Sequence, residues 1–97
     1  MKRPSKAAKA NTLILAETLD LAAVAPLRDE FIGARGAALT VDASRVQRIG
    51  GLCLQVLLAA RAAWRADDKA FGVADASPEF KNSLERAGAG DLLEGTA

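Results

Sequence analysis

The sequence contains no histidine, no tyrosine and a single cysteine, Cys53, among its 97 residues. Without histidine the chain lacks the most common general base and the most common metal ligand. A single cysteine forms neither an internal disulfide nor a thiolate metal cluster. We therefore expect no metal site, no cofactor and no catalytic residues, and an enzyme is the least favoured class of function.

Long apolar runs are also missing. The first apolar run, from Leu13 to Ala16, stops at Glu17 and is shorter than the roughly 7–15 apolar residues of a secretory signal. No stretch approaches the about 20 apolar residues that a membrane-spanning helix needs. These absences predict a cytoplasmic protein that does not insert into a membrane.

The net charge of +1 hides an uneven distribution. Four of the first ten residues are basic and none is acidic: Lys2, Arg3, Lys6 and Lys9. The rest of the chain holds nine of the thirteen basic residues and all twelve acidic ones. Because that part offers no basic stripe to extend the tail, a nucleic-acid partner is not expected. We predict a disordered basic tail over residues 1–11 and one domain over residues 12–97.

The first half of the chain predicts a strand, a helix and a second strand. Residues 12–16 form a continuous apolar run, which is typical of a strand buried on both faces. Residues 20–36 place three apolar side chains at helical spacing: Val24, Leu27 and Phe31. Pro26 suits a first turn and disrupts a helix interior, so the start of this helix stays open. Residues 37–44 form the second strand.

A long apolar helix is predicted over residues 51–66. One stripe of it carries seven side chains: Leu52, Cys53, Val56, Leu57, Ala60, Ala63 and Trp64. Leu54 and Leu58 lie near the opposite face, so the first two turns are apolar almost all round. Such a helix is buried on two sides or presents one side to a partner.

The end of the chain adds a third strand over residues 69–75 and a helix with clear end signals. Ser77 is typical of an N-cap, Pro78 of the first helical position and Gly88 of the residue beyond the end. Residues 91–93 add a final turn. Strands and helices thus alternate with short links, which predicts a small α/β fold with a mainly parallel central sheet and helices packed against it.

Two stretches carry a resemblance to a known family. The segment "LILAETLDLAAVAPLRDEF" and the strand "VDAS" with the helix start "GLCLQVLL" resemble a STAS domain over residues 12–93. In STAS-type anti-sigma factor antagonists the turn before that helix contains an aspartate followed by a phosphorylated serine or threonine. Aligned without gaps, Gly50 takes the place of the aspartate and Gly51 that of the hydroxyl residue. The resemblance therefore implies the fold and a binding surface, without phosphorylation at the usual position.

The function that this resemblance implies is protein binding in bacterial signal transduction. The partner would be a histidine-kinase-like or anti-sigma protein, in chemotaxis or in partner switching. The alternative is a cytoplasmic STAS subunit of a phospholipid or anion transporter, although the phospholipid branch normally keeps a hydroxyl at the turn. Association with a second copy of the chain is left open.

The predicted contact surface centres on the glycine pair and the start of the following helix. Its residues are Gly50, Gly51, Leu54, Arg45, Gln47 and Arg48, the last three supplying specificity. A turn with positive φ angles is the favoured reason for the glycine pair, and backbone binding of an anion is the alternative.

Three other candidates have a structural reading beside a functional one. Cys53 is expected to be a small core residue rather than a nucleophile. Asp42 and Ser44 are expected to cap a turn, with Ser44 as a substitute phosphorylation site in the alternative reading. Trp64 is expected to be a core residue rather than a platform for a nucleic-acid base.

Overall fold

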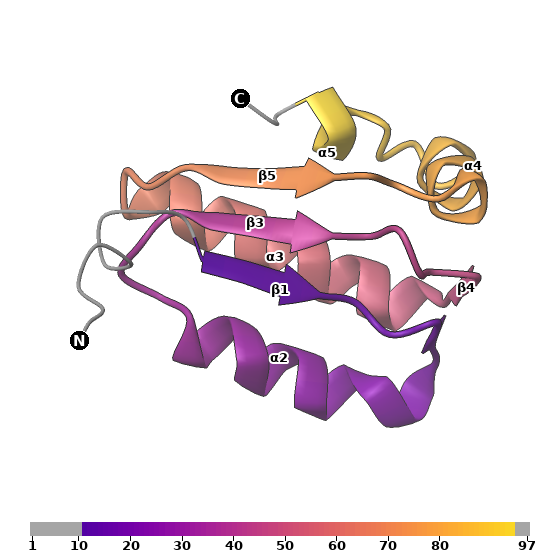
Figure 1. Cartoon of the computed structure of the whole chain (residues 1–97), viewed down its shortest axis with the longest axis horizontal. Helices are drawn as coiled ribbons and strands as arrows, with labels where there is room; N and C mark the ends of the chain where they lie inside the picture. The colour runs from indigo at the N-terminus through magenta and orange to yellow at the C-terminus, as the bar shows by residue number, and fades with distance from the viewer. Residues whose placement is uncertain (1–10, 95–97) are drawn as a thin grey trace.

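A computed structural model of the chain describes residues 11–94. Three parallel strands form its main sheet in the order β1 (Asn11–Ile14), β3 (Leu39–Asp42) and β5 (Phe71–Ala74) (Figure 1). Each is separated from the next by helical segments, so the predicted α/β fold with a parallel sheet is confirmed. The predicted basic tail lies outside the described residues, except for Asn11.

Residues 11–94 cover only one face of this sheet. Alternate residues of β3 and β5 are buried and the residues between them are partly exposed. Leu13, Val41 and Val73 lie side by side in register on the covered face. The helix α3 (Gly51–Ala66) lies behind the strands (Figure 1). No helix of the described residues lies on the face of the sheet that is turned toward the viewer.

The first strand was predicted to be buried on both faces, and that expectation is wrong. Thr12 and Ile14 are exposed, whereas Leu13 is buried. The reason is position, because β1 is an edge strand of a sheet with one open face. Its apolar run is continuous in the sequence, yet alternate side chains point to opposite faces.

The first helical segment begins with a short 3₁₀ turn, η1 (Leu21–Ala23), and continues as α2 (Val24–Gly33). Pro26 is the third residue of α2. The first N–H groups of a helix have no partner within the helix, so proline removes no hydrogen bond there. The buried side of α2 carries Leu27 and Phe31, as the periodicity predicts.

The helix α3 spans the predicted range, but two of its leucines are placed differently from the prediction. Leu52 is 56% exposed, although it was expected in the buried stripe. Leu54 is only 8% exposed, although it was expected near the opposite face. Side chains two residues apart in a helix point in directions that differ by about 200°, so the two leucines lie on different sides of α3. Leu54 faces α4 (Pro78–Arg86), which covers it together with β4 (Arg48–Ile49), whereas the side of α3 that carries Leu52 stays open.

A second, smaller parallel sheet was not predicted. It pairs β2 (Thr18–Leu19) with β4 (Arg48–Ile49), two residues each. The carbonyl oxygen of Glu17 extends this pairing by accepting bonds from the N–H groups of Gln47 and Arg48, at 2.8 and 3.1 Å. Segments of two residues show no periodicity, so the sequence pattern gives no sign of them.

Trp64 lies in an aromatic cluster on the covered side of the sheet. Its ring centroid is 6.2 Å from that of Phe31 and 5.6 Å from that of Phe71. The indole N–H donates a hydrogen bond of 2.8 Å to the carbonyl oxygen of Ala37. Because the side chain is buried and its polar atom is paired, the predicted core role is confirmed.

The last two helices pack against strands, the first of them against β4 and the second against β5. Helix α4 starts at the predicted cap, where the hydroxyl oxygen of Ser77 accepts a bond from the N–H of Phe80 at 3.1 Å. The predicted final turn is α5 (Asp91–Glu94). Arg61 of α3 holds it by donating to the carbonyl and to the carboxylate of Asp91, both at 3.1 Å.

Ser77→Ala is expected to lower the free energy of unfolding by about 1–3 kcal/mol. The substitution removes the cap of α4 and also leaves the carbonyl oxygen of Val46 without the hydroxyl that donates to it in the buried interior. Urea denaturation measures the loss. Ser83→Ala, in the middle of the same helix, is the matched control and is expected to change stability by less than about 0.5 kcal/mol. Equal losses in the two variants would contradict this role for Ser77.

Candidate functional site

The candidate site lies at the end of the sheet where β3 and β5 finish. In parallel α/β sheets this end collects the loops that lead into the next helices, and ligands commonly bind there. In this chain the loop of residues 43–50 follows β3 and leads into α3. All the site residues predicted from the sequence lie in this loop or in the first turn of α3.

The loop starts with a side-chain turn, as predicted. The carboxylate of Asp42 accepts a hydrogen bond of 2.9 Å from the backbone N–H of Ser44. This bond, with a smaller contribution from the Ser44 hydroxyl, holds the pKa of Asp42 below its ordinary value. The predicted turn cap is therefore confirmed.

Buried contacts hold the middle of the loop. The N–H of Ala43 donates to the carbonyl of Ala74, and the carbonyl of Ala43 accepts from the N–H of Ser77, each at 3.1 Å. Val46 is fully buried, and its carbonyl oxygen accepts the Ser77 hydroxyl. The loop is thus anchored to β5 and to the start of α4, so its exposed side chains project from a fixed backbone.

The glycine pair does not adopt the expected conformation. Gly50 is the N-cap of α3 with φ −88° and ψ 167°, which is ordinary extended backbone, and its N–H donates to the carbonyl of Leu19 at 2.9 Å. Gly51 is the first helical residue, and its φ is not positive. The prediction of a positive-φ turn is wrong, because the pairing of β4 with β2 already sets the direction of the chain. Among the described glycines, positive φ occurs instead at Gly36 and Gly88.

There is open space around these two glycines. A Cβ atom added to Gly51 would meet nothing within 4 Å, and one added to Gly50 would meet only the Leu19 carbonyl oxygen, at 3.6 Å. No side chain caps the start of α3, and its first turn holds no acidic residue. The positive end of the helix dipole is therefore presented on an open surface.

Five of the six predicted contact residues lie in this exposed region, and the sixth does not. The five are exposed, and they are Arg45, Gln47, Arg48, Gly50 and Gly51. Leu54 was predicted to belong with them, but its side chain is buried between α3 and α4. It forms part of the wall of a shallow hollow of about 300 Å³, across from Ser83 and Arg86.

Two exposed leucines, neither of them assigned to the contact surface from the sequence, stand beside the glycine pair. Leu52 is more than half exposed, and Leu21 of η1 is 75% exposed. The two elements are in contact, and the thiol of Cys53 links them by donating to the carbonyl of Asp20 at 3.3 Å. Leu21 and Val24 are at helical spacing, and this pattern predicts that Leu21 is buried. No signal in the sequence identifies Leu21 as exposed.

Cys53 is a core residue, as predicted. Its side chain is almost completely buried. Burial is the main reason that the pKa of the thiol is raised, and the charge of Asp20 raises it further. The nucleophile is the thiolate, so burial and a raised pKa both make Cys53 a poor nucleophile.

Within residues 11–94 no three histidine, cysteine, aspartate or glutamate side chains gather in a way that would hold a metal ion. In the same range no helix is both long enough and apolar enough to cross a membrane.

Comparison with known proteins gives one family. The model of the family described as "Mlab, STAS domain" matches residues 3–94. No curated protein and no solved structure matches the chain.

The Cys53 thiol is expected to react with a thiol reagent at least about tenfold more slowly in the native chain than in the urea-unfolded chain. Both lost access and a lower thiolate fraction produce this difference. The reaction is followed by absorbance at neutral pH. A cysteine at an exposed α3 position, Ala62→Cys with Cys53→Ala, is the control and should react as fast folded as unfolded. Equal rates for native and unfolded Cys53 would contradict its burial.

Proposed function

The chain belongs to the STAS domain family, and from this we propose that it is a non-catalytic protein-interaction module in bacterial signal transduction. Its contact surface is the exposed start of α3 with the neighbouring loop. The partner is a histidine-kinase-like or anti-sigma protein, in chemotaxis or in partner switching.

The observation that carries this proposal is the exposure of Leu21 and Leu52 beside an uncapped helix start. Specific interfaces have an apolar centre surrounded by a polar rim, in which arginine is enriched. Here Arg45, Gln47 and Arg48 form such a rim on a loop that buried hydrogen bonds hold in place. A rigid loop loses little conformational entropy on binding, which favours affinity.

Glycine at position 51 removes the usual means of control. In the family that the chain resembles, phosphate on a hydroxyl at this position releases the partner, and glycine has no oxygen to modify. Regulation of this module therefore comes from the amount of the partner or from a modification of the partner.

Gly51→Asp is expected to weaken partner binding at least tenfold while the fold stays as stable as before. A carboxylate at the first helical position interacts favourably with the dipole, by about 0.3–1 kcal/mol. No steric or backbone strain opposes it, because the added side chain meets open space and φ is not positive. In an interface, however, the new carboxylate loses its water and costs several kcal/mol if it stays unpaired.

The measurement is affinity capture from cells of the source organism, followed by titration of the identified partner and by urea melts. Gly51→Ala is the control, since it adds a Cβ without charge. A signalling kinase or anti-sigma protein that binds wild type and Gly51→Ala but not Gly51→Asp supports the proposal. Capture of a transporter ATPase or permease would assign the module to a transport complex instead. Unchanged affinity of Gly51→Asp would place the interface elsewhere.

The protein isolated from cells is expected to carry no phosphate. Ser44 is the exposed hydroxyl residue of the loop, and it already interacts with the Asp42 carboxylate, whose negative charge repels an added phosphate. Intact-mass spectrometry of the wild-type chain and of Ser44→Ala measures this. A stoichiometric phosphorylated species that Ser44→Ala abolishes would show that the switch has moved to Ser44.

A further inference from the structure

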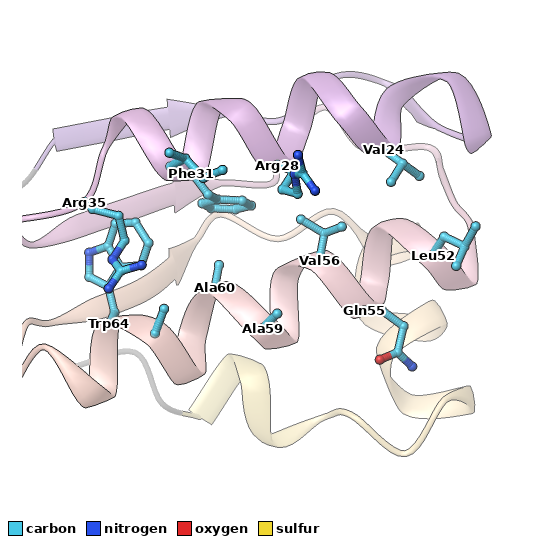
Figure 2. A pocket seen from close by; sticks show the side chains of 12 residues that line it. Val24, Arg28, Phe31, Arg35, Leu52, Gln55, Val56, Ala59, Ala60 and Trp64 are labelled. Atoms are coloured by element: carbon cyan, nitrogen blue, oxygen red, sulfur yellow. The ribbon is translucent and has the colours of Figure 1, made fainter.

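A second surface lies between α2 and α3, on the side of the molecule away from the open face of the sheet. The two helices are separated by an open apolar groove of about 450 Å³ (Figure 2). Phe31 of α2 and Ala60 and Trp64 of α3 lie deep in the groove and are buried. Ile32 of α2 and Leu52 of α3 stand at its margins, and each is more than half exposed.

The dimensions of this groove suit a helix. It runs along α3 from Leu52 to Trp64, twelve residues apart, which corresponds to about 18 Å or three helical turns. The α3 wall contains Ala59, Ala60 and Ala63, whose small side chains let another backbone approach. Packed helices lie about 8–10 Å apart, and small residues at the contact give the shorter distances.

The charged residues that line the groove are of one sign. Among the described residues no acidic side chain lines it, whereas two arginines of the α2 side do, Arg28 near its middle and Arg35 at one end (Figure 2). Arg35 lies over the Trp64 ring at 5.9 Å and forms an ion pair of 2.8 Å with Asp67. The guanidinium of Arg28 forms no hydrogen bond or ion pair with the residues whose side chains the structure describes, 11–93. The groove therefore combines an apolar floor with an available cation at its rim.

We propose that this groove binds an amphipathic helix of a partner protein, with the apolar side of that helix against Phe31 and Trp64 and an acidic residue facing Arg28. A small apolar ligand would fill the floor but leave Ile32 and Leu52 exposed, whereas a helix covers both. The chain's own first ten residues do not suit the site, because they carry four cations and no acid and face the same charge.

This inference goes beyond the proposed function, because it adds a second contact surface that shares only Leu52 with the first. The two surfaces are separable by mutation. Ala59→Glu places a charged side chain in the groove and leaves Gly51 unchanged. Ala62→Glu, which is exposed on the same helix but outside the groove, is the matched control.

The experiment uses a displayed library of helical peptides of about 18 residues that lack tryptophan. Peptides selected on the full wild-type chain are titrated while the emission of Trp64, the only tryptophan of the chain, is recorded. We expect enriched peptides to combine an apolar stripe with acidic residues on one flank and to shift this emission. Ala59→Glu and Arg28→Glu should each weaken binding at least tenfold, and Ala62→Glu and Gly51→Asp should not. Replacing the acids of a selected peptide by lysine should restore its binding to Arg28→Glu.

Several results would overturn the proposal. The library yields no binder, or selected peptides bind Ala59→Glu as tightly as wild type, or Arg28→Glu leaves the preference for acidic peptides unchanged. A fatty acid that shifts Trp64 emission where peptides fail would make the occupant a lipid. Dimerisation of the wild-type chain that Ala59→Glu abolishes would make it a second copy.

Discussion

The buried apolar side chains of all three strands point to the same face of the sheet, and the arrangement of the helices depends on this. Because Leu13, Val41 and Val73 lie in register on that face, α2 and α3 pack there side by side. Trp64 fills the space beneath them at one end and ties α3 to the chain before β3 through its bond to Ala37. Where α3 carries alanines instead, the space between the helices stays open as a groove.

The same packing leaves the beginning of α3 exposed at the end of the sheet. The loop before it is fixed by hydrogen bonds to Ala74, Ser77 and Glu17, so little of its conformation is left to change on binding. An uncapped helix start with Leu21 and Leu52 beside it then forms a preorganised, partly apolar surface. The two surfaces described for this chain, the loop with the start of α3 and the groove between the helices, thus follow from one packing arrangement.

Features set by local sequence were predictable and features set by distant contacts were not. The range of α3 and the Ser77 cap follow from helical periodicity and capping signals within a few residues. Leu52 and Leu54 exchanged places because α4, which is distant in the sequence, covers the side of α3 that carries Leu54, whereas the groove between α2 and α3 leaves Leu52 exposed. The glycine pair was misread because the direction of the chain there is set by pairing with Leu19, which no local pattern reveals. The position of the loop follows from local sequence and was predicted correctly. Leu21 and Leu52 were not assigned to its surface, because their exposure depends on distant contacts.

Binding of a partner to the loop and the start of α3 can be followed in the backbone amide spectrum of the isotope-labelled chain, recorded while the captured partner is added. The largest changes are expected at residues 44–55 and at Leu21, with small changes along β1 and β3. Changes concentrated instead on the open face of the sheet, at Thr12, Ile14 and Thr40, would contradict binding at the loop and the start of α3.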